Sequence, residues 1–259
     1  MSERMPVLFV SHGAPTLPFD DVPARRFLIE LARKVPRPNA ILCVSAHWEA
    51  PMPSLNAAAQ PGTIHDFSGF PGALYELSYD APGAPEVAER AAALLRTAGY
   101  EPCLDPERGR DHGAWVPAML AWPAGEIPMI QLSLLRGRST RDHIALGEAI
   151  APLRDEGVLI LGSGGSVHNL RQVSWDGGRT PRWASDFQDW LDKSLAANDL
   201  AALADYRKLD FAVMAQPTED HILPLYVALG AGHKDGGATK LHGSFTLGSL
   251  GMASYGWDV

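Results

Sequence analysis

Histidine is the residue type whose placement in this sequence carries the most chemical information. Nine histidines occur among 259 residues. His12 and His47 each follow a short apolar run directly, and His168 follows a third run through the glycine-rich turn Gly162-Ser163-Gly164-Gly165. A neutral imidazole can bind Fe, Zn or Cu and can move protons near neutral pH. These positions therefore predict metal or acid–base chemistry.

The runs that precede these histidines are expected to be buried strands. They are continuous rather than alternating, which is typical of strands covered on both faces. They comprise residues 7–10, 40–45, 129–134 and 158–161. Helical patterns lie between them: one opens at Asp21-Val22-Pro23, and others cover residues 84–98, 140–153, 181–197 and 219–229. This alternation predicts an α/β fold, a single three-layer α/β/α domain over residues 1–259 with a mostly parallel central sheet.

Such a fold would bring the histidines together. Ligands of open α/β sheets bind outside the carboxyl ends of the strands, where His12, His47 and His168 fall. His112 stands just before a short expected helix, and His221 is expected in the first turn of the helix over 219–229, with Thr218 as its N-cap. Residues 50–80, rich in Pro and Gly, are expected to form a long loop, and residues 241–250 a last antiparallel edge strand.

The other histidines have a more ordinary interpretation. We expect His143 and His233 on helical surfaces or ends and His242 on an exposed strand, none of them as ligands. His65 could line the cleft. The aromatic residues Phe67, Phe70, Tyr75 and Trp115 could form a slot for a substrate ring, although core packing explains them equally well.

Several function classes are excluded. The turn at 162–165 lacks both G-x-G-x-x-G and the Lys-Ser/Thr end of a P-loop, and no G-x-S-x-G elbow occurs. The formal net charge is -8 and no Lys/Arg run appears, so nucleic acid is not an expected partner. No signal peptide or membrane-spanning stretch is evident, and Cys43 and Cys103 form no disulfide framework. A cytoplasmic location, away from the membrane, is the expectation.

Six motifs, in this order, resemble a known family. They are Ser11-His12-Gly13-Ala14-Pro15, Ser45-Ala46-His47-Trp48, His65-Asp66-Phe67 with Gly69-Phe70-Pro71, Asp111-His112-Gly113, Gly162-Ser163-Gly164 with His168-Asn169-Leu170, and Pro217-Thr218 with His221. Together they resemble the class III extradiol ring-cleavage dioxygenases of the LigB-like superfamily, in the branch called 4,5-DOPA dioxygenase extradiol-like. The resemblance spans about residues 6–257.

The resemblance implies a LigB-like fold and assigns roles to the histidines. His12, His47 and His221 would be metal ligands. His168 would lie beside the metal as the acid/base group or as an extra ligand, and His112 would contact substrate or oxygen. The third ligand departs from the 2-His-1-carboxylate triad of many extradiol enzymes, with Glu219 and Asp220 as nearby carboxylates.

The implied activity is cleavage of a catechol-type ring, possibly DOPA-like, with O₂ and Fe(II), in an oxidoreductase that incorporates both oxygen atoms. His65, Phe67 and Trp115 are the candidate substrate-binding residues. An all-histidine site could also hold Zn(II), so a zinc-dependent hydrolase on the same fold is one alternative. A non-catalytic metal-site protein similar to the Memo-type relatives is another.

Overall fold

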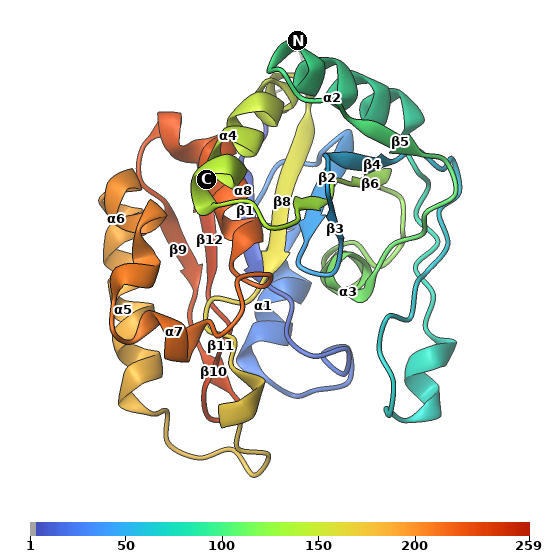
Figure 1. Cartoon of the computed structure of the whole chain (residues 1–259). Coiled ribbons are helices and arrows are strands. Elements are labelled where there is room, and N and C mark those ends of the chain that lie inside the picture. The colour runs from blue at the N-terminus through green and yellow to red at the C-terminus, as the bar shows by residue number, and fades with distance from the viewer. Residues whose placement is uncertain (1–3) are drawn as a thin grey trace.

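A six-stranded, mostly parallel sheet forms the centre of the protein (Figure 1). The computed structural model describes residues 4–259, so the first three residues, which bear on the signal-peptide expectation, lie outside the described residues. The strand order is β6-β2-β8-β1-β12-β9. The strands are β1 (Val7–Ser11), β2 (Ala40–Ser45), β6 (Met129–Gln131), β8 (Val158–Gly164), β9 (Thr239–His242) and β12 (Ser254–Trp257). The first four are mutually parallel, whereas β12 and β9 close one side with antiparallel pairing.

The strand register brings three carboxyl ends to the same level. Strand β8 lies between β1 and β2, with Ser11 opposite Gly164 and Ser45 opposite Ser163. Two further bonds extend these ladders: the His12 N–H donates to the Gly164 carbonyl at 3.0 Å, and the Ala46 N–H donates to the Ser163 carbonyl at 3.0 Å. The segments that carry His12 and His47 therefore start side by side.

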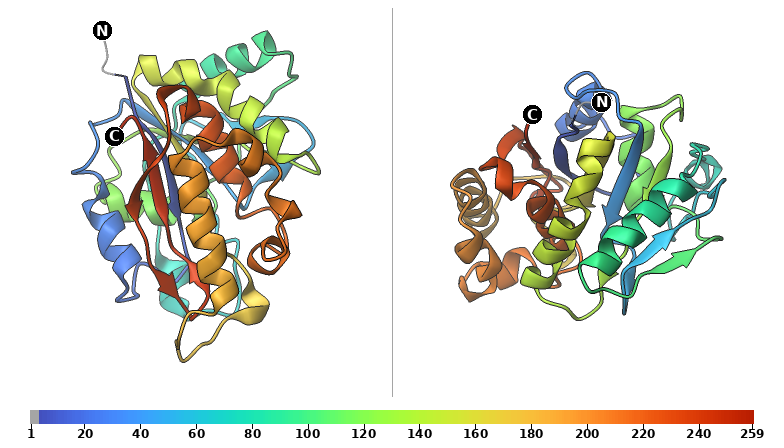
Figure 2. Two further views of the ribbon diagram at one scale, coloured as in Figure 1. Left: turned by 90° about the vertical axis from the view of Figure 1, so that its left-hand side faces the viewer. Right: turned by 90° about the horizontal axis from the view of Figure 1, so that it is seen from above.

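Helices cover both faces of the sheet, as the two further views show (Figure 2). Helices α1 (Pro23–Leu31) and α3 (His112–Ala121) pack on one face, against Leu8, Val10 and their neighbours. Helices α2 (Pro85–Thr97), α4 (Thr140–Ile150), α5 (Arg182–Ala196) and α8 (Leu223–Gly232) share a core with the other face, against residues such as Phe9. Because successive strand residues point to opposite faces, each strand serves both cores. The predicted three-layer α/β/α fold is confirmed.

Shorter elements surround these layers. Three two-stranded sheets pair β3 (Glu49–Ala50) with β7 (Leu134–Leu135), β4 (Ser54–Asn56) with β5 (Cys103–Asp105), and β10 (Phe245–Thr246) with β11 (Leu250–Gly251). Helices α6 (Leu200–Ala204) and α7 (Ala212–Ala215) precede α8. The 3-10 helices are Gly72–Glu76, Ala151–Glu156, Leu170–Gln172, Tyr206–Lys208 and His233–Asp235. Within residues 4–259, no helix is both long and apolar enough to cross a membrane.

Several local expectations need correction. The helix expected over 219–229 begins only at Leu223, so His221 lies in the turn before α8, and Thr218 is not its N-cap. The run 129–134 divides into β6 and a separate short strand, β7. His143 is fully buried rather than on a helix surface: its Nε2 accepts from the Leu135 N–H at 3.1 Å and its Nδ1 donates to the Ser139 carbonyl at 2.8 Å. It is nevertheless a structural histidine, as expected.

Candidate metal and catalytic site

Three histidines from distant parts of the sequence meet at the carboxyl ends of the parallel strands. His12 follows β1, His47 lies two residues after β2, and His221 precedes α8. One ligand atom from each lies within 4.8 Å of the others. The His12 and His47 Nε2 atoms are 3.1 Å apart. The three rings are buried or nearly so, which keeps bulk water from most of their surface.

The orientation of the His12 ring is fixed by a serine of the central strand. Its Nδ1 lies 3.0 Å from the Ser163 Oγ, and the Ser163 hydroxyl itself donates to the Gly113 carbonyl. Because that hydroxyl proton is already committed, the Ser163 oxygen accepts from the His12 Nδ1–H. The lone pair of the His12 Nε2 is left facing His47, which is the arrangement that metal-bound histidines require.

A carboxylate sets the His221 ring in the same way. The Asp220 Oδ2 accepts from the His221 Nδ1 at 2.5 Å, so the Nε2 is free for a ligand role. The pKa of Asp220 is well below its usual value: burial raises it, but the hydrogen bond and charge of His221 outweigh burial. The backbone also holds this turn, because the His221 carbonyl accepts from the Gly165 N–H at 2.8 Å. A Cβ on Gly164 would lie 2.0 Å from that same carbonyl oxygen, so only glycine permits the contact.

Asp66 holds the fourth buried imidazole, that of His112. Its Oδ1 accepts from the His112 backbone N–H at 2.8 Å, and both carboxylate oxygens lie 3.0 Å from the His112 Nδ1. The Asp66 carboxylate therefore lies at the N-terminus of α3, where the helix dipole favours negative charge. Burial raises the pKa of Asp66, but the bonds from His112 bring it down to about 2. An ionised carboxylate can only accept, so the His112 Nδ1 carries the proton.

Asp66 also lies near His47, with 3.3 Å between the Asp66 Oδ2 and the His47 Nδ1. His47, Asp66 and His112 thus form a second group of potential ligand atoms. The hydrogen bonds between Asp66 and His112 already account for this arrangement. The first group, in which the Nε2 atoms of His12 and His47 face each other, is therefore the better candidate for a metal position.

Two of the ligand candidates, His12 and His47, are neutral at neutral pH. Burial, followed by the charges of His112 and His221, lowers the pKa of His47 to about 3. Burial, followed by the charge of His47, lowers the pKa of His12 well below its usual range. Neutral imidazoles offer lone pairs to a cation without first losing a proton, which favours metal binding.

His168 lies directly against the third ligand candidate. Its ring stacks on that of His221 with 3.5 Å between centroids and 6° between planes. The His168 backbone N–H donates to the Ala215 carbonyl at 2.9 Å, which ties the segment after β8 to α7. Burial, and secondly the charge of His221, lowers the pKa of His168 to about 3. Its ring is therefore neutral near pH 7, and it lines the cavity beside the histidines.

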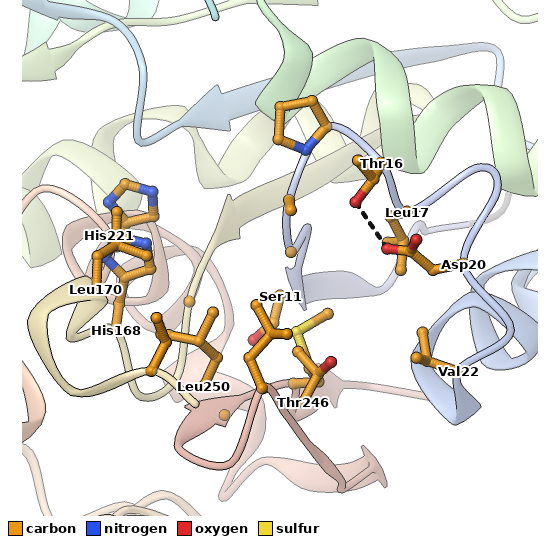
Figure 3. A pocket seen from close by; sticks show the side chains of 18 of the residues that line it. Ser11, Thr16, Leu17, Asp20, Val22, His168, Leu170, His221, Thr246 and Leu250 are labelled. Atoms are coloured by element: carbon orange, nitrogen blue, oxygen red, sulfur yellow. Dashed lines mark hydrogen bonds between the residues drawn. The ribbon is translucent and has the colours of Figure 1, made fainter. Parts of the chain in front are cut away.

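The cavity beside the histidines has a volume of about 600 Å³ and is partly shown in Figure 3. His47, His112, His168 and His221 line one end, and Phe67 and Phe70 line the wall near them. The other two aromatic residues predicted for a substrate slot, Tyr75 and Trp115, do not line the cavity.

The structure separates the three substrate-binding candidates. Phe67 lines the cavity, but His65 and Trp115 do not. Trp115 is fully buried and its Nε1–H donates to the Ile64 carbonyl at 3.0 Å, while the His65 Nε2 donates to the Leu77 carbonyl at 2.9 Å. Both rings lie near Phe67, at centroid distances of 6.4 Å and 5.7 Å. They support the position of Phe67 instead of contacting the cavity.

The donor set fits one divalent metal ion. Two nitrogens that each lie ~2.1 Å from one ion at roughly right angles are about 3 Å apart, which matches the measured 3.1 Å between His12 and His47. With the His47 proton on Nδ1, which lies 3.3 Å from the Asp66 Oδ2, the lone pairs of both Nε2 atoms can bind the same cation. The fit rests on imidazoles alone, because Asp220 is engaged by His221 and Glu219 accepts from the Tyr206 hydroxyl at 2.9 Å.

Sequence reasoning missed three residues that position the site: Asp66, Ser163 and, as a hydrogen-bond partner, Asp220. Asp66 lies inside the His65-Asp66-Phe67 motif, of which only His65 and Phe67 are predicted as site residues. One signal was available, because ligand histidines usually donate their second nitrogen to a carboxylate or hydroxyl. A carboxylate or hydroxyl partner is therefore expected for each predicted ligand histidine, but the sequence does not identify which residue provides it.

Comparisons with known proteins agree with this architecture. The family model described as the catalytic LigB subunit of aromatic ring-opening dioxygenase matches residues 7–257. The chain is 40% identical to the 4,5-DOPA dioxygenase extradiol of Beta vulgaris, covering 95% of this chain and 94% of that protein. It is 39% identical to the protein of the same name from Escherichia coli K12, covering 98% and 94%.

A solved structure is similar over the whole length. The crystal structure of an uncharacterized protein from Escherichia coli K12 matches with a TM-score of 0.83 and 33% sequence identity, covering 98% of this chain and 100% of that one. The layered fold with histidines at the strand ends is thus that of the aromatic ring-opening dioxygenases. The chain belongs to the LigB family, and it is an extradiol-type dioxygenase.

Proposed function

We propose that the protein is a non-haem Fe(II)-dependent extradiol dioxygenase that opens the ring of a catechol-type substrate with O₂. The observation that carries this proposal is the meeting of His12, His47 and His221, whose free Nε2 atoms converge beside a cavity with aromatic walls. Both atoms of O₂ enter the product, so a catechol gives a ring-opened hydroxymuconic semialdehyde without another oxidant.

The metal would be held by His12, His47 and His221. When bound, Fe(II) supplies the one-electron chemistry that allows a closed-shell diol to react with O₂, which Zn(II) cannot supply. The chain's own groups bind the ring and move protons. Phe67 and Phe70 offer faces on which an aromatic ring can pack.

Two further histidines have roles that do not require metal ligation. His168 is proposed to take a proton from the diol, because its neutral ring lines the cavity next to His221. His112 is proposed to contact substrate or oxygen through its Nε2, since Asp66 occupies its Nδ1. The positions support these roles, because both imidazoles lie at the end of the cavity that holds the ligand candidates.

The test loads the metal-free protein anaerobically with Fe(II) and then adds a panel of catechols in aerated buffer. We expect oxygen uptake equal to the diol consumed, together with a yellow ring-opened product. A panel without any turnover would exclude the proposal. Protein loaded with Zn(II) is the control: it should consume no oxygen, and hydrolysis of esters or amides by it would favour a zinc hydrolase instead.

A further inference from the structure

The cavity beside the histidines is much larger than the ring of a diol requires. Its volume of about 600 Å³ falls in the range of sites for drug-sized ligands. His168 and His221 lie at one side of it, whereas Thr16, Asp20 and Val22 lie across from them (Figure 3). A diol bound at the histidines therefore leaves most of this space for whatever the ring carries.

The wall of the cavity away from the histidines is mostly apolar and is built from three segments. One follows β1, one follows β8, and the third is the β10–β11 hairpin. These segments contribute Leu17, Val22, Val173, Leu247 and Leu250, whereas Leu170 lies beside His168 (Figure 3). Such walls favour uncharged groups, because burial of each methylene is favourable while an unpaired ion loses its hydration.

The charged groups in the wall all have the wrong sign for an anionic substrate. Apart from the histidines, they are Asp20 and Asp21, and within residues 4–259 no Lys or Arg lines the cavity. Asp20 accepts from the Thr16 hydroxyl at 2.8 Å, and Asp21 pairs at 2.6 Å with the exposed Arg26, which is outside the wall. Away from the histidines, a substrate carboxylate would therefore face two aspartates without a Lys or Arg among the described lining residues.

We propose that the natural substrate is a catechol with an uncharged apolar substituent of about four carbons or more and without a carboxylate. This inference rests on the proposed ring-cleavage function and adds the substrate class. It predicts that the amino-acid substituent of DOPA fits poorly. The amine of DOPA could approach Asp20, but the carboxylate of DOPA would still lack a partner.

A matched pair of diols tests the inference. The compounds are 4-butylcatechol and 3-(3,4-dihydroxyphenyl)propionate, whose substituents have similar length but differ in charge. With Fe(II)-loaded enzyme we expect kcat/KM to be at least tenfold higher for 4-butylcatechol. An equal or higher value for the propionate, or for DOPA, would overturn the inference while leaving ring cleavage intact.

Anaerobic calorimetry of the same two compounds separates this inference from the proposed function. Tighter binding of 4-butylcatechol without turnover of either compound would support the substrate class and reject the dioxygenase. Equal binding of both compounds would reject the substrate class, whatever the activity.

Placing a cation in the wall should reverse the preference. Leu250→Arg adds a positive charge at the hairpin, and Trp175→Arg adds one at an 80% exposed rim position, so the test remains decisive if the first variant fails to fold. In either variant we expect the kcat/KM ratio of butyl to propionate compound to fall at least fivefold. Val213→Arg, exposed on α7 and outside the wall, is the control and should leave the ratio unchanged. An unchanged ratio in a folded cavity variant would contradict the charge argument.

Discussion

At the scale of single residues, the hydrogen bonds on the far side of each ring decide what the site can do. Ser163 takes the His12 Nδ1–H and Asp220 takes that of His221, so both Nε2 atoms face the same point as acceptors. Neither partner contacts the cation position. Their effect is to remove the tautomers that cannot bind metal, which lowers the entropic cost of binding.

Alanine variants should separate ligands from proton-handling groups. His12→Ala and His47→Ala remove facing Nε2 atoms, so we expect both proteins to lose stoichiometric metal. His112→Ala and His168→Ala should retain most of the metal and lose turnover. Metal analysis of the four purified variants after Fe(II) loading measures this. Equal metal loss in all four would make His112 and His168 ligands.

Asp66→Asn tests the carboxylate that holds His112. The substitution keeps the side-chain shape but removes the charge and one acceptor, so the His112 ring loses its fixed orientation. We expect turnover to fall by roughly 10–100-fold, the range for lost ligand-supporting contacts, with much of the metal still bound. Steady-state oxygen uptake and metal content are the two measurements. A variant with normal turnover would show that His112 needs no anchor.

At the scale of elements, the sequence predicted which strand ends meet but not how the turn before α8 is built. The pattern from 219 onward is helical in composition, yet α8 starts at Leu223, with Pro224 in its first turn. His221 is instead held by its carbonyl bond to Gly165 and its ring bond to Asp220. The bond to Gly165 depends on tertiary packing against the end of β8, which local periodicity does not encode.

Helix α3 approaches the site so closely that its second residue must be glycine. A Cβ on Gly113 would lie 2.2 Å from the Ser45 Oγ and 2.9 Å from the His47 Cδ2. Gly113→Ala should therefore displace His47 and weaken Fe(II) binding by about tenfold or more. Gly72→Ala, at a glycine with open space around it, is the control. Titration with a competing chelator measures the affinities, and equal affinities in both variants would refute the packing argument.

Helix α4 contains a buried histidine that should affect stability but not metal. His143→Ala leaves the Leu135 N–H without its acceptor and opens a cavity, so we expect a loss of about 2–3 kcal/mol in unfolding free energy at pH 7.5. Burial lowers the pKa of His143. The unfolded chain thus binds a proton more readily, and wild-type stability falls as pH drops below about 6.5.

The His143→Ala variant lacks the contribution of the His143 imidazole to the pH dependence of stability. The difference between wild type and His143→Ala should therefore shrink between pH 7.5 and pH 5, as followed by urea unfolding at each pH. A difference that grows toward pH 5 would mean that the native state favours the charged form of His143. Metal content should remain that of the wild type at neutral pH.

At the scale of the whole molecule, the sequence predicted the parallel half of the sheet well and the antiparallel half poorly. Strands β1, β2 and β8 are continuous apolar runs and stand out without structural knowledge. Strand β12 is buried between β1 and β9, yet it consists of Ser254-Tyr255-Gly256-Trp257 and has no such run. Its burial comes from pairing with β1 and from packing of its aromatic rings, contacts between opposite ends of the chain.

Arg154 connects those distant parts at the end of the sheet opposite the metal site. It is fully buried in the 3-10 helix before β8, and it donates to the Met5 carbonyl at 2.7 Å and the Ala231 carbonyl at 3.0 Å. It also pairs with Asp235 and with the Asp258 carboxylate, the latter at 3.1 Å. The start of β1, the end of α8 and the residue after β12 therefore share one cation.

Removing that cation should weaken the whole fold without touching the chemistry. In Arg154→Ala the two carbonyls and two carboxylates lose a common donor, so we expect about 3 kcal/mol less unfolding free energy in urea. Arg90→Ala, which breaks a largely exposed pair with Glu156, should cost under ~1 kcal/mol. Both variants should bind Fe(II) as the wild type does, because the histidines proposed as ligands lie at the other ends of the strands. Equal losses in the two variants, or metal loss confined to Arg154→Ala, would show that this end of the sheet is not an independent anchor.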